Sequence, residues 1–303
     1  MELWIIFSIL NPLIFALVNI TDKRVLSEFN LSIRSFNLFV GISQGVIGII
    51  LFLINIPSNI TFTLFIIGCS IGFLQGISLI IMFWMIKKTE PSRVSTIMST
   101  YPIYVAIMGV IIFNEILSIL NWLAIFIAIA GTILASLKFS DKGKKSNKFF
   151  EPLLLLLVIS AVLVGSSHLV TKSITEEFSH YQIVSMRNIG ISITMMALFL
   201  RKKSFIELCH FIAIPKKSIW LILSQGISPV FGHLSLTYAI ANGPVALVST
   251  ITSARAVFIF LISLLGSYIA PKLVYEKFTL SDIAIKLISA LMVIVSIILI
   301  TYW

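Results

Sequence analysis

Arg255 is a charged residue that could bind a substrate, and it lies about half-way along an apolar run from residue 244 to residue 268. This run is long enough to cross a hydrocarbon core of about 30 Å at about 1.5 Å per residue. A guanidinium at that depth costs at least ~2.5 kcal/mol, and it cannot lose its proton to avoid this cost. Arg255 therefore needs a compensating partner, and its planar fork of donors suits a carboxylate or a phosphate.

Carboxylates are missing from the interior of the apolar runs. All 12 acidic residues fall at the ends of these runs or between them. We therefore expect Arg255 to be compensated by backbone carbonyl groups, by water, or by an acidic group from outside the chain. A substrate anion would be such a group.

Two histidines lie at a depth similar to that of Arg255. His168 is about fifteen residues into the apolar run 153–174, and His233 is about fourteen residues into the parallel run 219–240. At about 1.5 Å per residue, all three side chains lie about 20 Å from the lysine-rich ends of these runs. Buried polar groups of this kind often mark a transport pathway, and a hydrogen bond between helices is the alternative for each histidine. Two histidines without a third ligand do not make a metal site.

Other polar side chains at membrane depth complete the predicted site, and each could instead join two helices through a hydrogen bond. The predicted substrate-binding residues are Arg255, His168, His233, Gln75, Tyr101 and Tyr238. We expect no catalytic residue, no cofactor and no bound metal. Arg187 lies near a helix end, and we expect it to anchor the chain at the membrane interface; the alternative is that Arg187 reaches the cavity together with Asn188.

The composition indicates which class of protein holds these residues. Of the 303 residues, 58% are hydrophobic and 11% are charged, whereas about a quarter are charged in soluble domains. The chain is therefore expected to be an all-α polytopic membrane protein. Its net charge of +10 comes largely from short basic loops that set the topology, so nucleic acid is not an expected partner.

Ten apolar runs are long enough, or nearly so, to cross a bilayer. They are residues 3–20, 33–54, 64–86, 92–113, 119–137, 153–174, 181–200, 219–240, 244–268 and 283–302. Each run must be a helix, because a backbone exposed to lipid has to satisfy its own hydrogen bonds and the runs lack the alternation of barrel strands. Glycines spaced four residues apart, such as Gly68, Gly72 and Gly76, are expected to let helices approach closely.

The basic residues of the loops indicate the orientation in the membrane. They are Lys23, Arg24, Lys87, Lys88, Lys138, Lys142, Lys144, Lys145, Lys148, Arg201, Lys202, Lys203, Lys216, Lys217, Lys272 and Lys277. All of these fall in the odd-numbered loops. By the positive-inside rule, we expect the odd loops in the cytoplasm and both termini outside, in a cell membrane such as the bacterial inner membrane. We call the two sides of the protein the odd-loop face and the even-loop face, of which the second carries both termini.

The sequence divides into two similar halves. Residues 138–152 form a basic polar linker between a first five-helix repeat, 1–137, and a second one, 153–303. Short matches flank the same helices in both halves, for example Glu90–Pro91 and Gly243–Pro244 before the fourth helix. Because five crossings are an odd number, the second repeat must be inverted relative to the first. Inverted repeats are typical of secondary transporters, whose substrate site lies between the halves.

Residues 89–97, with Tyr101–Pro102 and Asn114–Glu115, and the later stretch 238–246 resemble the EamA domain pair of the drug/metabolite transporter superfamily. The resemblance covers nearly the whole chain and implies a multi-pass transporter, with export as the commoner role. The second half departs from the family pattern through a longer loop before its last helix. It also departs through Arg255, which stands near the position that Tyr101–Pro102 has in the first half.

The predicted function is a secondary transporter for a small metabolite, without ATP drive because no nucleotide-binding loop is present. We expect an exporter of an amino acid or another zwitterionic or anionic compound, which works by alternating access. A nucleotide-sugar, sugar or drug transporter of the same superfamily is an alternative, as are a membrane-embedded enzyme and a non-transporting scaffold. An enzyme is disfavoured because no metalloprotease-type motif and no acid occur within the runs. The coupling partner stays open between a proton and an exchange substrate, and the oligomeric state is also open.

Overall fold

The structure is a computed structural model that describes residues 2–57, 60–86, 94, 97–136, 152–269 and 280–302. In this part of the chain all regular structure is helical, and nine helices are long and apolar enough to cross a membrane. A shorter apolar helix, Tyr101–Phe113, accompanies them. The chain is thus an all-α polytopic membrane protein. Residues 138–151 of the predicted linker, Glu90–Pro91 and Glu276 lie outside the described residues.

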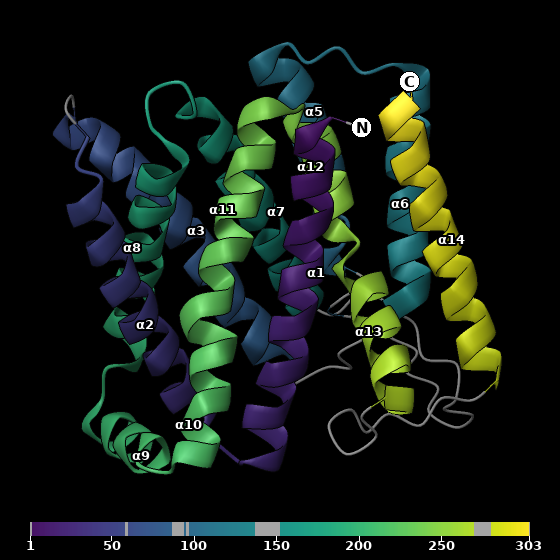
Figure 1. Cartoon of the computed structure of the whole chain (residues 1–303). Coiled ribbons are helices and arrows are strands. Elements are labelled where there is room, and N and C mark those ends of the chain that lie inside the picture. Colours follow the sequence, from purple (N-terminus) through teal and green to yellow (C-terminus); the bar gives the residue numbers. More distant parts are fainter. Residues whose placement is uncertain are drawn as a thin grey trace.

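The helix bounds follow the apolar runs of the sequence. The helices are α1 (Leu3–Lys23), η1 (Arg24–Glu28), α2 (Ile33–Ile54), α3 (Phe62–Ile86), α5 (Tyr101–Phe113), α6 (Ile119–Ser136), α7 (Pro152–Ser173), α8 (His180–Phe199), α9 (Lys202–Ile212), α10 (Pro215–Ile222), η2 (Leu223–Ile227), α11 (Ser228–Asn242), α12 (Val245–Ser253), α13 (Arg255–Ile269) and α14 (Leu280–Tyr302). The two ends of the chain lie at the same end of the bundle, and α9 lies at the opposite end (Figure 1). This arrangement fits an even number of crossings.

The ninth apolar run is broken into α12 and α13. Helix α12 ends at Ser253, the next residue Ala254 has backbone angles of φ −69° and ψ 10°, and α13 begins at Arg255. The hydroxyl groups of Thr250, Thr252 and Ser253 donate to carbonyl oxygens three or four residues earlier. Such bonds compete with the backbone ladder and bend helices, so the local sequence explains why the helix ends here. The break places Arg255 in the first turn of a new helix.

The eighth apolar run contains a π-helical turn, η2, before α11. Pro229 occupies the first turn of α11, where its missing N–H group costs least. In η2, the carbonyl oxygen of Gln225 accepts hydrogen bonds from Ser43 Oγ at 2.8 Å and from Gln44 Nε2 at 3.1 Å, both on α2. Side chains of a neighbouring helix thus satisfy a carbonyl group that a π turn leaves available, and such turns frequently lie at functional sites.

The principal helix contacts join the first half of the chain to the second. At one side of the bundle α2 packs against α8, and at the other side α6 packs against α14 (Figure 1). In the centre, α3 packs against α7, α1 against α11, and α5 against α12. The pattern of these contacts stays the same when the two halves of the chain are exchanged. For example, the third helix of one half packs against the first helix of the other in both cases.

Glycines allow α2 and α3 to contact α8 closely. A Cβ atom on Gly72 would overlap the carbonyl oxygen of Arg187, and one on Gly190 would overlap the carbonyl oxygen of Cys69. On α2, a Cβ atom on Gly48 would lie 3.0 Å from the backbone of α8. The backbones of α3 and α8 therefore touch. The expectation that glycine stripes serve close packing is confirmed.

The seventh loop contains an additional helix, α9, which is too short and too polar to count among the apolar runs of the sequence. Its Leu208 and Phe211 are buried among apolar residues of α2 and η1. Glu207 accepts hydrogen bonds from the backbone N–H of Ser32 at 2.9 Å and from the hydroxyl groups of Ser32 and Ser35 at 2.6 Å each. Burial raises the pKa of Glu207, but these hydrogen bonds outweigh burial and hold its pKa below the usual value. Helix α9 is thus fixed to the start of α2.

Candidate functional site

A cavity of about 200 Å³ lies inside the bundle and is lined by residues from both halves of the chain. Five of the six predicted site residues line it. They are Arg255 from α13, His168 from α7, His233 from α11, Gln75 from α3 and Tyr101 from α5. The structure therefore brings together side chains from five helices. The two that are farthest apart in the sequence, Gln75 and Arg255, are separated by 180 residues.

Arg255 supplies a positive charge to this cavity. Its guanidinium lies over the ring of Phe15, with Cζ 4.6 Å from the ring centroid. Within the described ranges, Arg255 forms no hydrogen bond and no ion pair, so its donors remain available to the cavity. The first N–H groups of an α-helix also lack partners within the helix and carry the positive end of its dipole. Arg255 and the start of α13 therefore both favour an anion.

His233 links polar residues of two other helices. Its Nε2 lies 3.3 Å from Gln75 Nε2 on α3, and its Nδ1 lies 3.3 Å from Asn188 Oδ1 on α8. A neutral imidazole that carries its proton on Nδ1 donates to Asn188 and accepts from Gln75, so this tautomer satisfies both contacts. The ring also packs against Phe15, with centroids 5.4 Å apart. His233 and Arg255 thus both contact the Phe15 ring.

Tyr101 and His168 form a second group of contacts, around the end of α12. The Tyr101 hydroxyl donates to the Ser249 carbonyl oxygen at 3.1 Å and lies 2.9 Å from Thr252 Oγ1. His168 Nδ1 lies 2.8 Å from Ser249 Oγ, and the rings of Tyr101 and His168 meet edge to face at 5.3 Å. These bonds hold α12 beside α5 and α7. They also fix the position at which the chain breaks before Arg255.

Tyr238 is the predicted site residue that does not line the cavity. Its ring packs against Phe7, with centroids 4.3 Å apart, and against His180, at 5.2 Å. Tyr238 lies five residues after His233 on the same helix. At about 100° per residue, its side chain is turned roughly 140° away from that of His233. The structure thus separates Tyr238 from the other predicted residues.

Arg187 is buried inside the bundle, so the expectation that it anchors the chain at the membrane interface is wrong. Its exposed fraction is 0%, and its Nη2 donates to Thr171 Oγ1 of α7 at 2.6 Å. Its Nε and Nη1 have no hydrogen-bond partner in the described part of the chain. The physical reason for the burial is the glycine contact at Gly72, which lets α3 cover this turn of α8.

Asp22 is a buried carboxylate, so the expectation that no acid lies within the membrane helices is wrong. Helix α1 continues past Thr21, and the exposed fraction of Asp22 is 8%. Gln225 Nε2 donates to Asp22 Oδ2 at 2.7 Å. Asp22 lies on one face of α1 with the cavity residues Phe15 and Asn19, at helical spacing. That spacing is the signal from which the sequence could have indicated it.

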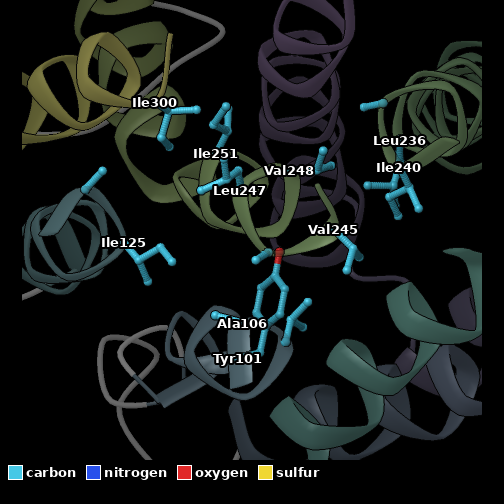
Figure 2. Packing of buried hydrophobic residues seen from close by; sticks show 14 of the residues in the cluster. Tyr101, Ala106, Ile125, Leu236, Ile240, Val245, Leu247, Val248, Ile251 and Ile300 are labelled. Atoms are coloured by element: carbon cyan, nitrogen blue, oxygen red, sulfur yellow. The ribbon is translucent and has the colours of Figure 1, made fainter. Parts of the chain in front are cut away.

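Apolar packing closes the even-loop side of the cavity. Residues from the starts of α1, α6 and α12 and from the ends of α11 and α14 form one buried cluster. Figure 2 shows the Tyr101 hydroxyl pointing toward α12, where Val245 and Val248 belong to this cluster. The cavity residues Met82 and Ile259, in contrast, lie toward the odd-loop ends of their runs. The cavity therefore extends from the middle of the bundle toward the odd-loop face.

Two charged side chains hold the turn between α11 and α12 on the closed side. Glu115 accepts hydrogen bonds from the first two N–H groups of α12, at 2.5 and 3.3 Å. Lys172 Nζ donates to the carbonyl oxygens of Ile240 and Gly243, at 2.9 and 3.0 Å. An anion at a helix N-terminus and a cation at a helix C-terminus both complement the helix dipole. Glu115 belongs to the first half and α12 to the second, so the bonds of Glu115 join the halves at this face, whereas those of Lys172 lie within the second half.

The comparison with known families decides the identity of the first half. Residues 2–137 match the EamA-like transporter family. The first half of the chain is an EamA-like transporter domain. This confirms the resemblance to EamA-type members of the drug/metabolite transporter superfamily. The EamA-like domain supplies Gln75, Tyr101 and Glu115, whereas Arg255 and the two cavity histidines come from the second half, which this match does not cover.

Two individual proteins are similar to this chain at low sequence identity. An uncharacterised transporter of Helicobacter pylori (strain J99) is 22% identical over 185 residues, which are 60% of this chain and 59% of that protein. A solved structure, described only as a crystal structure of a protein, covers 99% of this chain and 98% of its own length. Its TM-score is 0.71 at 13% identity, so the similarity concerns the fold alone.

Proposed function

We propose that the chain is a secondary transporter that moves a small anionic or zwitterionic metabolite, such as an amino acid, by alternating access. The main support is Arg255, a permanent cation that faces a cavity between the two halves and has neither ion pair nor hydrogen bond among the described residues. A substrate carboxylate at this place would gain a charge-assisted bond of roughly 1.5 to 3 kcal/mol. The family resemblance favours export.

An inverted repeat would provide the two conformations that alternating access needs. The exchange symmetry of the helix contacts supports such a repeat. The helix breaks support it too, because α5 begins after a turn at Ser99–Thr100 and α13 begins after Ala254. Counted from Pro91 and Pro244, which are equivalent in the sequence, the two breaks fall within one residue of each other. On this proposal α5 completes a tenth crossing.

The size of the cavity favours a small metabolite over the alternative substrates. A volume of about 200 Å³ is equivalent to roughly seven water molecules of liquid volume. Pockets for drug-sized ligands typically measure about 300 to 1,000 Å³. In the conformation described here, the cavity thus suits an amino acid better than a nucleotide sugar or a drug. Recovery of the substrate chemically unchanged after transport would separate a transporter from a membrane-embedded enzyme.

The proposal is tested by a thermal-shift screen of the purified protein against amino acids, organic acids, sugars and nucleosides. A ligand at 100 times its dissociation constant stabilises the folded state by about 2.7 kcal/mol. We expect compounds with a carboxylate to raise the unfolding temperature of the wild type but not that of Arg255→Gln. A neutral sugar or nucleoside that stabilises both proteins equally would contradict the proposed substrate class.

The proposed orientation can be tested with a native cysteine. Cys209 on α9 is exposed, and α9 lies in the seventh loop, at the odd-loop face. If this face is cytoplasmic, a membrane-impermeant thiol reagent should label Cys209 only after the cells are permeabilised. The matched control combines Cys209→Ser with Glu177→Cys in the exposed sixth loop, which intact cells should label. The opposite pattern would reverse the orientation.

A further inference from the structure

One buried acid has no role in the site as described so far. Asp22 lies near the odd-loop end of α1, and Gln225 donates to one of its carboxylate oxygens. The other oxygen, Oδ1, is buried and has no hydrogen-bond partner among the residues that the structure describes. An ionised carboxylate can accept about four hydrogen bonds, and a buried one is costly when most of these are missing. A proton on Oδ1 would remove this charge and its cost.

Arg255 provides a positive charge near the carboxylate of Asp22. Arg255 lies over the ring of Phe15, which shares one face of α1 with Asp22, and among the described residues the two opposite charges form no ion pair. The charge of Arg255 therefore stabilises the ionised form of Asp22 from a distance. The guanidinium of Arg255 lies over the ring of Phe15 and lines the cavity, so it can also face a cavity anion.

Other polar and charged groups surround this pair without replacing Arg255. From η2, Gln225 donates to Asp22, whereas the hydroxyl group of Ser224 donates to the carbonyl oxygen of Leu221. From η1, Arg24 pairs with Glu28 at 3.0 Å and lies over the Trp220 ring. From α10, Lys217 lies over the rings of Phe29 and Phe211, and Lys216 is exposed. Helix α12 has no charged residue, and α11 faces α1 with neutral His233 against Phe15.

We propose that Asp22 binds the coupling proton of the transporter, and that the charge state around Arg255 determines whether this proton is bound. The proposal rests on the proposed function. Asp22 and Arg255 together are neutral when the cavity is empty. A substrate anion at Arg255 adds one negative charge, and a proton from water that adds to Asp22 Oδ1 restores neutrality. When the anion leaves, the positive charge of Arg255 favours release of the proton to water.

This scheme gives the direction of coupling. Because the anion and the proton favour each other's binding, they cross the membrane together, in the same direction and in a ratio of one to one. Export therefore proceeds when the outward gradient of the metabolite exceeds the inward gradient of the proton. For a substrate with one net negative charge, the loaded transporter has the same net charge as the empty one. By linkage, proton binding must strengthen anion binding by the same factor by which anion binding strengthens proton binding.

The competing explanation is that Asp22 only joins α1 to η2 through Gln225. The two explanations differ in a proton titration, which needs no substrate. Infrared difference spectra of the purified full-length protein report the carbonyl stretch of protonated carboxyl groups. We expect one buried carboxyl to titrate in the wild type and to be absent in Asp22→Asn, which keeps an acceptor for Gln225.

The role of Arg255 is tested with Arg255→Gln. This substitution removes the positive charge and so imitates its neutralisation by a bound anion. Loss of the positive charge should move the Asp22 midpoint to higher pH by about one unit, a tenfold gain in proton affinity. Arg255→Lys keeps the charge and should leave the midpoint near that of the wild type. Arg255→Met provides the same neutral charge if the Gln variant does not fold.

Two results would overturn the inference. One is an unchanged carboxyl titration in Asp22→Asn, and the other is a midpoint that is the same in Arg255→Gln and Arg255→Lys. Both are independent of transport, because the titration uses the proton alone as ligand. If instead the titration behaves as expected but no compound in the screen is bound or transported, the proposed function fails and the proton site remains.

Discussion

Arg255→Gln should reduce transport to the background of empty liposomes, and Arg255→Lys should weaken it by about ten- to hundredfold. The Gln side chain has no charge for a substrate carboxylate. The Lys side chain keeps the charge but offers a point ammonium in place of a planar fork, so it cannot form the same two parallel hydrogen bonds. The measurement is counterflow of a radiolabelled ligand from the thermal-shift screen into liposomes that contain the purified variants.

Arg34→Gln is the matched control for these variants. Arg34 lies in the first turn of α2 and is exposed, so this change removes the same charge without altering the cavity. Its transport rate should equal that of the wild type. If a folded Arg255→Gln protein also transported at the wild-type rate, Arg255 would not be part of the substrate site.

The grouping of the cavity residues could be predicted because depth in a membrane helix follows from residue counts. Each residue adds about 1.5 Å along the axis, so the positions of Arg255, His168 and His233 within their runs place them at one level. The rotation of each helix is a different quantity and depends on packing. Tyr238 shows this, because it lies within about two turns of His233 along α11 and yet faces Phe7 and His180.

The predicted positions of Asp22 and Arg187 were wrong because burial depends on where a helix ends and on which neighbouring helix covers it. Asp22 follows an apolar run and precedes two basic residues, a pattern that is typical of a loop. In the structure the helix continues through it, and Gln225 from η2 meets it 203 residues later in the chain. Arg187 was misjudged for a similar reason. No local pattern shows that a glycine on α3 lets that helix cover its backbone.

The break in the ninth apolar run depends both on the local sequence and on tertiary contacts. The run of hydroxyl residues from Ser249 to Ser253 is visible in the sequence and explains the break. Contacts from Tyr101 and His168 then hold the end of α12 in place. The sequence therefore indicates that the helix can end near Arg255. The tertiary structure directs the new helix start toward a cavity.

Gly72→Ala should sharply reduce the yield and the thermal stability of the folded protein, although it adds only one methyl group. Its Cβ would overlap the carbonyl oxygen of Arg187, and because that atom belongs to the backbone of α8, the two helices would have to separate. Overpacking of this kind costs about 1 to 3 kcal/mol or more, and separation would also disturb the buried guanidinium that bonds Thr171. Fluorescence-detected gel filtration after heating measures the effect. The control is Gly226→Ala, whose Cβ would meet its nearest neighbour at 3.4 Å, and a Gly72→Ala protein as stable as this control would contradict the close contact of α3 and α8.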